Sequence, residues 1–297
     1  MITVRTSVLD IACEQSGPAD ATPVVLLHGF PYDPRGYDDV VGILNRAGYR
    51  TFVPYLRGYG PTRFLSPDTP RSGEQAALGH DLLELLDALK LPRAVLAGFD
   101  WGGRAACIVS ALWPERVIGL VTCGGYNIQN IAVSHQPAAP EQELRYWYQY
   151  YFHTERGRNG LTENRRALCR LLWSLWSPTW TFDDATYERT AKSFDNADFV
   201  DVVIQSYRHR MKAAPGDPRY AGIEAQLAGQ PIIRVPTITI HGAVDGVTPM
   251  QGSEGHPEYF GAHYERRVLA NVGHNPPQED PKAFTDAILA LGKGVLA

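Results

Sequence analysis

The stretch Gly98-Phe99-Asp100-Trp101-Gly102-Gly103 places a carboxylate between glycines. It follows the apolar run from Ala94 to Ala97 and precedes a helical run from about Arg104, so the pattern predicts a strand, a sharp turn and a helix. Such a turn lifts its central side chain above the end of a sheet, and glycines allow strand and helix to approach closely. Asp100 is ionised at neutral pH and can attack an sp3 carbon that carries a leaving oxygen or halide. We therefore expect catalysis through an alkyl-enzyme ester, and we do not expect the enzyme to be a simple esterase.

Two further residues follow later strands and could complete a catalytic triad. Asp245 follows the apolar run from Val235 to Ile240, and His274 follows the last predicted strand, Arg266 to Leu269. The carboxyl ends of parallel strands meet at one edge of a sheet, where ligands bind. The order nucleophile, acid, histidine is that of a strand–turn–helix hydrolase. We expect His274 to deprotonate a water molecule and Asp245 to orient its ring.

The turn His28-Gly29-Phe30-Pro31 follows another apolar run, Pro23 to Leu27. It can direct the backbone N–H of Phe30 toward the nucleophile, and the N–H of Trp101 directly follows the nucleophile. Together these two donors predict an oxyanion hole, in which one donor is typically worth about 2.7–4 kcal/mol. His28 itself is interpreted as a residue that holds its loop.

Strand and helix patterns alternate along the chain, which predicts an α/β fold with a mostly parallel sheet covered by helices on both faces. Besides the runs already given, we expect strands at 2–12, 50–54 and 117–122, and helices at about 37–47, 72–89 with Ser72 as its N-cap, 104–111 and 281–291. From about 127 to 231 no strand is predicted, and aromatic residues at helical spacing are frequent. We expect residues 1–126 and 232–297 to form the core and 127–231 a helical insertion.

The composition is that of an ordinary globular protein, with 297 residues, 44% of them hydrophobic, and a net charge of −4. No basic block predicts nucleic-acid binding, and no apolar run is long enough to span a membrane. The first residues lack the apolar core of a signal peptide, so a cytoplasmic protein is expected. Four cysteines without a C-x-x-C pair predict free, buried thiols. No metal or cofactor motif is found, and the sequence leaves open whether the chain forms a homodimer.

These motifs resemble the α/β-hydrolase superfamily, and within it the epoxide hydrolase and dehalogenase branch, with soluble epoxide hydrolases the most similar. The resemblance covers nearly the whole chain and makes the insertion a cap domain. In epoxide hydrolases two cap tyrosines donate hydrogen bonds to the epoxide oxygen. The pattern Tyr148-Gln149-Tyr150-Tyr151-Phe152 matches the first, and Ser206-Tyr207-Arg208 matches the second. The resemblance thus assigns this role to Tyr148 and Tyr207.

The resemblance implies that the chain opens an epoxide to a vicinal diol. Asp100 would form a hydroxyalkyl ester, and water activated by His274 and Asp245 would hydrolyse it, without a metal or cofactor. The aromatic cap predicts an apolar substrate pocket, and we place Phe30, Trp101 and Trp147 in it. The expected partner is a small apolar epoxide.

The sequence leaves three alternatives. A haloalkane dehalogenase would share the triad, but such enzymes usually carry Asn where this chain has Phe30. A haloacid dehalogenase of the fluoroacetate type would use two arginines after the nucleophile; Arg104 matches the second, while Trp101 occupies the first position. A non-catalytic ligand receptor on the same fold usually lacks a triad member, and all three are present here.

Overall fold

The computed structural model describes residues 1–294, and its centre is a mixed sheet with the strand order β1-β2-β4-β3-β6-β7-β8-β9. Strand β5 pairs with β2 beside this path. The pairs β1–β2, β2–β4 and β2–β5 are antiparallel, and the pairs from β4 to β9 are parallel. The strands are β1 (Ile2–Arg5), β2 (Leu9–Ser16), β3 (Pro23–Leu27), β4 (Arg50–Pro54), β5 (Arg63–Phe64), β6 (Ala94–Gly98), β7 (Val117–Cys123), β8 (Thr237–Gly242) and β9 (Tyr264–Leu269).

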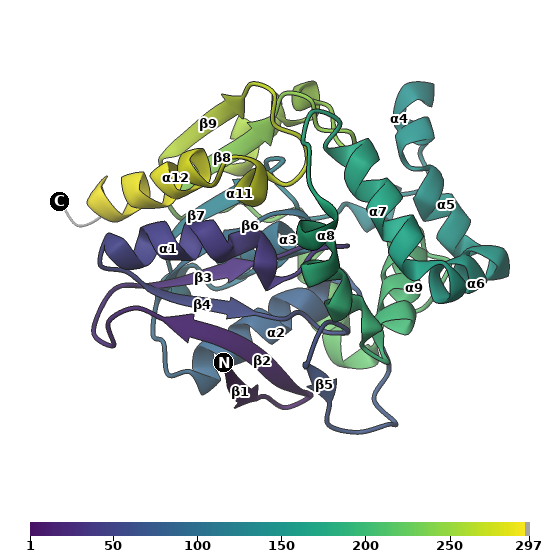
Figure 1. The fold of residues 1–297 in the computed structure, drawn as a ribbon, viewed down its shortest axis with the longest axis horizontal. Helices are drawn as coiled ribbons and strands as arrows, with labels where there is room; N and C mark the ends of the chain where they lie inside the picture. Colours follow the sequence, from purple (N-terminus) through teal and green to yellow (C-terminus); the bar gives the residue numbers. More distant parts are fainter. Residues whose placement is uncertain (295–297) are drawn as a thin grey trace.

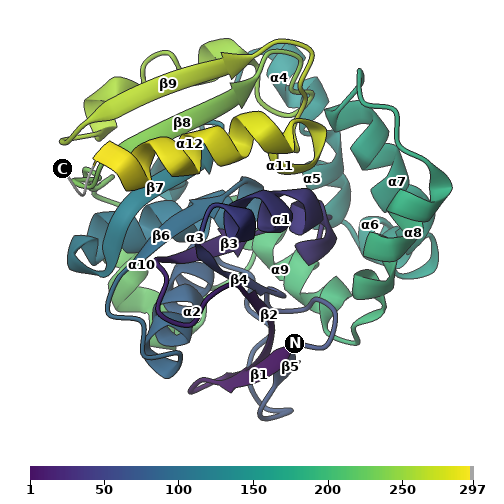
Figure 2. The same cartoon turned by 60° about the vertical axis from the view of Figure 1, so that its left-hand side comes forward.

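Helices cover both faces of this sheet, as the alternating pattern predicted. Figures 1 and 2 show α1 (Asp38–Arg46) and α12 (Pro281–Gly294) on one face and α2 (Gln75–Ala88) and α3 (Asp100–Leu112) on the other. Every residue of β6 is buried, because a parallel strand between two helical layers has no solvent-facing side. The sheet is thus a rigid frame whose parallel strands all end at one edge.

A group of helices lies beside the carboxyl ends of the parallel strands, to the right in Figure 1. It comprises α4 (Pro140–Arg145), α5 (Trp147–His153), α6 (Glu155–Glu163), α7 (Arg165–Trp176), α8 (Asp184–Ala191) and α9 (Phe199–Arg210). The last helix of the predicted insertion, α10 (Ala221–Leu227), lies elsewhere and packs on α2 of the core (Figure 2). Short helical turns and α11 (Pro276–Glu279) complete the described elements.

Two predicted elements differ from the structure. The opening segment forms a hairpin of two strands, β1 and β2, instead of one strand, because the chain turns back at Thr6, whose hydroxyl accepts the N–H of Leu9. Helix α2 begins at Gln75, and Glu74 stands at its N-cap position. Ser72, the predicted N-cap, lies too early, because its backbone carbonyl accepts a hydrogen bond from Arg57 and its hydroxyl accepts the N–H of Glu74.

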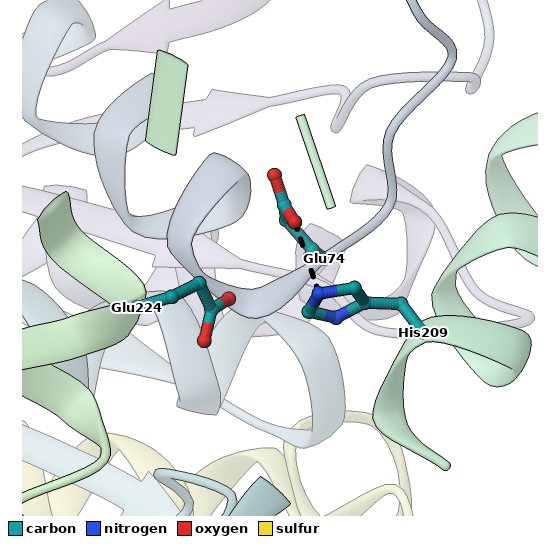
Figure 3. Close-up of side chains that lie close together, drawn as sticks. All are labelled: Glu74, His209 and Glu224. Carbon is teal, nitrogen blue, oxygen red and sulfur yellow. Dashed lines mark ion pairs between the residues drawn. The ribbon is translucent and has the colours of Figure 1, made fainter. Parts of the chain in front are cut away.

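The junction between core and insertion brings together Glu74 at the N-cap of α2, His209 of α9 and Glu224 of α10 (Figure 3). Glu74 Oε2 lies 3.2 Å from His209 Nε2, and its carboxylate accepts the N–H of Asp217. Burial raises the pKa of Glu74 to about 7. The Glu224 carboxylate accepts the N–H of Ala76, in the first turn of α2. These side chains therefore tie the N-terminus of α2 to the helices of the insertion.

Two sequence predictions can be compared directly with the described part of the chain. All four cysteines are free and buried, as expected. Among residues 1–294, no helix combines the length and the apolar character needed to cross a membrane.

Candidate active site

Asp100 stands at the predicted turn between β6 and α3, and its backbone has a φ of 50°. Positive φ is uncommon for a residue other than glycine and marks a strained turn. The flanking glycines are needed for space. A Cβ at Gly102 would lie 2.0 Å from the carbonyl oxygen of Leu27, and one at Gly98 would lie 2.7 Å from the carbonyl carbon of Gly102. The turn thus holds the Asp100 carboxylate above the sheet edge, as the glycine pattern predicted.

His274 and Asp245 meet Asp100 at this edge. The Nδ1 atom of His274 lies 2.9 Å from Asp245 Oδ2, while Asp245 Oδ1 accepts the N–H groups of Val247 and Thr248. The Nε2 atom of His274 lies 3.5 Å from Asp100 Oδ2 and makes no hydrogen bond within residues 1–294. Burial opposes protonation of His274, but the carboxylates of Asp245 and Asp100 outweigh it and raise its pKa to about 10.

The Asp100 carboxylate is held in its ionised form. Burial favours the neutral acid, but the contacts with His274, the charge of Arg104 and the N–H of Phe30 together lower the pKa of Asp100 below its usual value. The Phe30 N–H donates to Asp100 Oδ1 over 2.8 Å. Trp101 is the second residue of α3, and the first N–H groups of a helix have no acceptor inside it. Both predicted donors therefore lie beside the Asp100 carboxylate.

His28 lies beneath the site and is completely buried. Its Nε2 accepts the N–H of Leu56, and its Nδ1 lies 3.0 Å from the carbonyl oxygen of Gly29. Burial lowers the pKa of His28 to about 4, so the ring is neutral and Nδ1 carries the proton. These contacts fit the interpretation that His28 holds the loop that carries Phe30.

Tyr148 and Tyr207 come from two different helices, α5 and α9, and the structure brings their rings to a centroid distance of 5.4 Å. Both side chains are buried. Gln149 Nε2 donates to the Tyr148 hydroxyl over 3.2 Å. Burial raises the pKa of both phenols and Asp100 adds to this effect, while the charge of Arg210 opposes it, so both are neutral at physiological pH. A neutral phenol can donate a hydrogen bond to a developing alkoxide.

A cavity of about 620 Å³ opens above these groups. Asp100, His274, Asp245 and Tyr148 line it, together with the loop that follows β7. The lining mixes polar and apolar side chains, where the aromatic insertion predicted an apolar pocket. Its polar members include amides, histidines and two arginines, among them Asn127, Gln129, Gln149, His135, Arg104 and Arg210.

The aromatic residues predicted for the pocket occupy other places. Phe30 and Trp101 are fully buried under the site, with stacked rings at a centroid distance of 5.8 Å. Trp147 lines a neighbouring hollow with Leu175 and Pro249. Successive residues of a helix point about 100° apart, so α5 turns Trp147 away from the cavity that its neighbour Tyr148 faces. The expectation that Trp147 lines the same cavity as Asp100 therefore does not match the described geometry.

Arg210 lines the cavity and was not among the predicted site residues. Arg104 was considered only as a residue for binding a haloacid substrate. Arg104 follows Asp100 by four residues on α3, and Arg210 follows Tyr207 by three on α9. Residues at these spacings share a helix face. The spacing from each catalytic candidate was therefore the signal that could have identified both.

One group within residues 1–294 has the residue types and spacing of a metal site, the junction cluster of Glu74, His209 and Glu224 in Figure 3. Its two carboxylates already accept backbone N–H groups of Asp217 and Ala76. The group lines none of the cavity that contains Asp100. We therefore interpret it as a structural junction.

Comparison with known proteins agrees with this geometry. Residues 22–281 match the family model described as the alpha/beta hydrolase fold. "Epoxide hydrolase 3" of Siraitia grosvenorii is 34% identical over 141 residues, which are 47% of this chain and 41% of that protein. "Epoxide hydrolase A" of Mycobacterium tuberculosis is 24% identical across 98% of this chain and 97% of its own. The matches to the first two curated relatives span only 41% and 34% of those proteins.

A solved structure from Klebsiella pneumoniae is much more similar. It was provisionally named an epoxide hydrolase, and it is 46% identical to this chain with a TM-score of 0.96. The alignment covers 98% of this chain and 97% of that one. The chain therefore belongs to the α/β-hydrolase fold family, and its relatives within that family include epoxide hydrolases.

Proposed function

We propose that this protein is an epoxide hydrolase that converts an epoxide to a vicinal diol through an ester on Asp100. The observation that carries the proposal is the pair of buried, neutral tyrosines, Tyr148 and Tyr207, close to a carboxylate nucleophile. An epoxide needs both groups at once, because its carbon is attacked while its oxygen leaves as an alkoxide. The names of the relatives support the same reaction.

In the first step, Asp100 attacks one epoxide carbon and the carbon–oxygen bond breaks. The developing alkoxide receives hydrogen bonds from Tyr148, which lines the cavity, and from Tyr207, whose ring centroid lies 5.4 Å from that of Tyr148, and then a proton from one of these phenols. Asp100 is suited to this attack because its pKa is low and its φ of 50° presents the carboxylate above the sheet. The product of this step is a neutral hydroxyalkyl ester.

In the second step, water attacks the ester carbonyl carbon of Asp100. While Asp100 is ionised, its charge helps to hold a proton on His274. Ester formation removes that charge, so the pKa of His274 falls and the ring releases its Nε2 proton, which replaces the proton that the phenol gave to the alkoxide. The neutral ring can then accept a proton from water through Nε2. Asp245 holds Nδ1, and the N–H groups of Phe30 and Trp101 are placed to stabilise the oxyanion. The diol then leaves and Asp100 is regenerated.

A haloalkane dehalogenase is the second candidate, and one observation favours it. The indole N–H of Trp101, directly after the nucleophile, is buried without an acceptor within residues 1–294. A halide leaving group could accept that hydrogen bond. The two tyrosines have no comparable role in halide departure, which is why we place the epoxide reaction first.

The test is intact-protein mass spectrometry of the His274→Gln variant with styrene oxide and, separately, with a haloalkane. The variant can form the ester but lacks the base that hydrolyses it. We expect a stable adduct with the full mass of styrene oxide, and no adduct when Asp100 is also changed to Asn. An adduct with the haloalkane alone, accompanied by halide release, would instead establish the dehalogenase reaction.

A further inference from the structure

Two arginines face the cavity without a carboxylate dedicated to either. Arg104 lies on α3, one turn after Asp100, and Arg210 lies near the end of α9, one turn after Tyr207. Within residues 1–294, neither guanidinium forms an ion pair with an aspartate or glutamate at 4.0 Å or less. Most other arginines of the insertion form such an ion pair, for example Arg158 with Asp201. The two cavity arginines therefore differ from most of the arginines around them.

Both side chains are held in place by uncharged groups, a backbone carbonyl for Arg104 and an aromatic ring for Arg210, which do not neutralise their positive charge. Arg104 is 9% exposed, and its Nε donates to the backbone carbonyl of Asn127 over 3.2 Å. Burial and the charge of Arg210 lower the pKa of Arg104 to about 10, so it stays protonated at neutral pH. The Arg210 guanidinium lies 4.2 Å from the centre of the Tyr207 ring, and its Nε and Nη2 are buried without an acceptor in the described chain.

The other charges around the cavity do not neutralise this pair. Asp100 partly offsets Arg104, but its carboxylate is also shared with His274 and Phe30, and the proposed reaction converts it to a neutral ester. Glu143 also lines the cavity, where its carboxylate accepts hydrogen bonds from the hydroxyl of Tyr150 and the N–H of Ala138. Arg104 is buried and Arg210 is half-buried, and the charge of Arg210 acts on Arg104, so a ligand that supplies a negative charge between them is favoured.

We infer that the cavity takes an epoxide that carries a carboxylate a short distance from its ring, with Arg210 as the main anion-binding residue and Arg104 as the second cation. This inference rests on the proposed function. Guanidinium groups bind carboxylates through paired, charge-assisted hydrogen bonds, and Arg210 lines the cavity without a carboxylate partner in the described chain. The amides of Gln129 and Gln149 in the same lining suit a polar substrate. The substrate class is thus an epoxy acid, where the sequence alone predicted an apolar epoxide.

The test compares two substrates of similar size and shape, the anionic 3-phenylglycidate and the neutral 3-phenylglycidamide, by kcat/KM for diol formation. Hydrogen bonds to a charged group typically correspond to about a 10- to 100-fold preference. We expect the wild-type protein to favour the acid by at least about tenfold, and the Arg210→Gln variant to lose most of that ratio. Arg210→Lys should keep part of it. Arg156→Gln is the matched control, because Arg156 is an exposed arginine of the same region, and it should keep the full ratio.

The outcomes separate this inference from the proposed function. Diol formed from both substrates at equal kcat/KM, with the same ratio in Arg210→Gln, would overturn the epoxy-acid inference and leave the epoxide hydrolase proposal standing. If neither compound is hydrolysed, calorimetric binding of 3-phenylpropionate and 3-phenylpropionamide decides. Tighter binding of the acid that is lost in Arg210→Gln supports the anion site, and equal binding refutes it. Circular dichroism melting shows whether each variant is folded.

Discussion

The charge of Asp100 should control the protonation of His274, and replacing Asp100 with Asn measures this control. The variant removes one negative charge 3.5 Å from His274 Nε2 and keeps the size of the side chain. At that distance two unit charges interact by about 5 kcal/mol at an effective dielectric constant of 20 and by about 1 kcal/mol in water. Since a change of one in pKa corresponds to about 1.4 kcal/mol, the pKa of His274 should fall by about 1 to 3.5 from its value of about 10.

The assay is an NMR titration of histidine side chains in wild-type protein and in Asp100→Asn. The chain has nine histidines, so His274→Gln is recorded in parallel to assign the signal. Asn at position 100 is neutral, as the proposed ester would be, and the titration therefore reports the basicity of His274 during the hydrolytic step. Asp245 still contacts Nδ1 in this variant and keeps the ring in place.

An unchanged His274 titration in Asp100→Asn would refute the reasoning. It would mean that Asp245 alone sets the pKa of the ring and that ester formation does not release the base. A fall of more than about 4 would also contradict it, since a single charge at this distance cannot supply so large an effect at an effective dielectric constant of 20.

Three further results are expected. Replacing either cap tyrosine of the site with Phe should lower kcat/KM for epoxide opening by about 10²- to 10⁴-fold, measured as the rate of ester formation, because proton donation to the alkoxide is lost; an unchanged rate would remove that tyrosine from the mechanism. Gly29→Ala should abolish most activity, because the new Cβ would lie 2.4 Å from the Cβ of the nucleophile, whereas Gly222→Ala, where no atom lies within 4 Å, should leave the diol-forming rate unchanged. Asp81→Asn should lower the free energy of unfolding by about 3–5 kcal/mol in urea denaturation, because it leaves the fully buried Arg57 without its carboxylate; a loss below about 1 kcal/mol would contradict this account.

Local sequence was sufficient to predict the turn at Asp100 and the positions of Asp245 and His274. A strand, a glycine-bounded turn and a helix are determined by neighbouring residues, so the position of Asp100 could be predicted from Gly98 and Gly102. Parallel strands bring the loops at their carboxyl ends to one edge, which is why Asp245 and His274 could be predicted to meet Asp100. The order of the motifs along the chain was therefore enough to predict that these three residues lie together.

The insertion was predictable only in part. Its helical character comes from residue spacing, and the resemblance nominated the two tyrosines that the structure brings together. Which face of α5 points into the cavity depends on how the helix packs, and this turned Trp147 away from it. The packing of α10 on α2 likewise depends on contacts between Glu224 and residues far away in the chain.

The sequence by itself determined the scaffold and the positions of Asp100, Asp245 and His274 at the ends of strands, because each lies in a short motif that follows a strand. Only the tertiary structure decided the character of the cavity. Arg104 on α3 and Arg210 on α9 lie more than a hundred residues apart in the chain, and the fold brings both to the same cavity. Helical spacing could point to each arginine separately, but the packing of whole helices decides that both line one cavity.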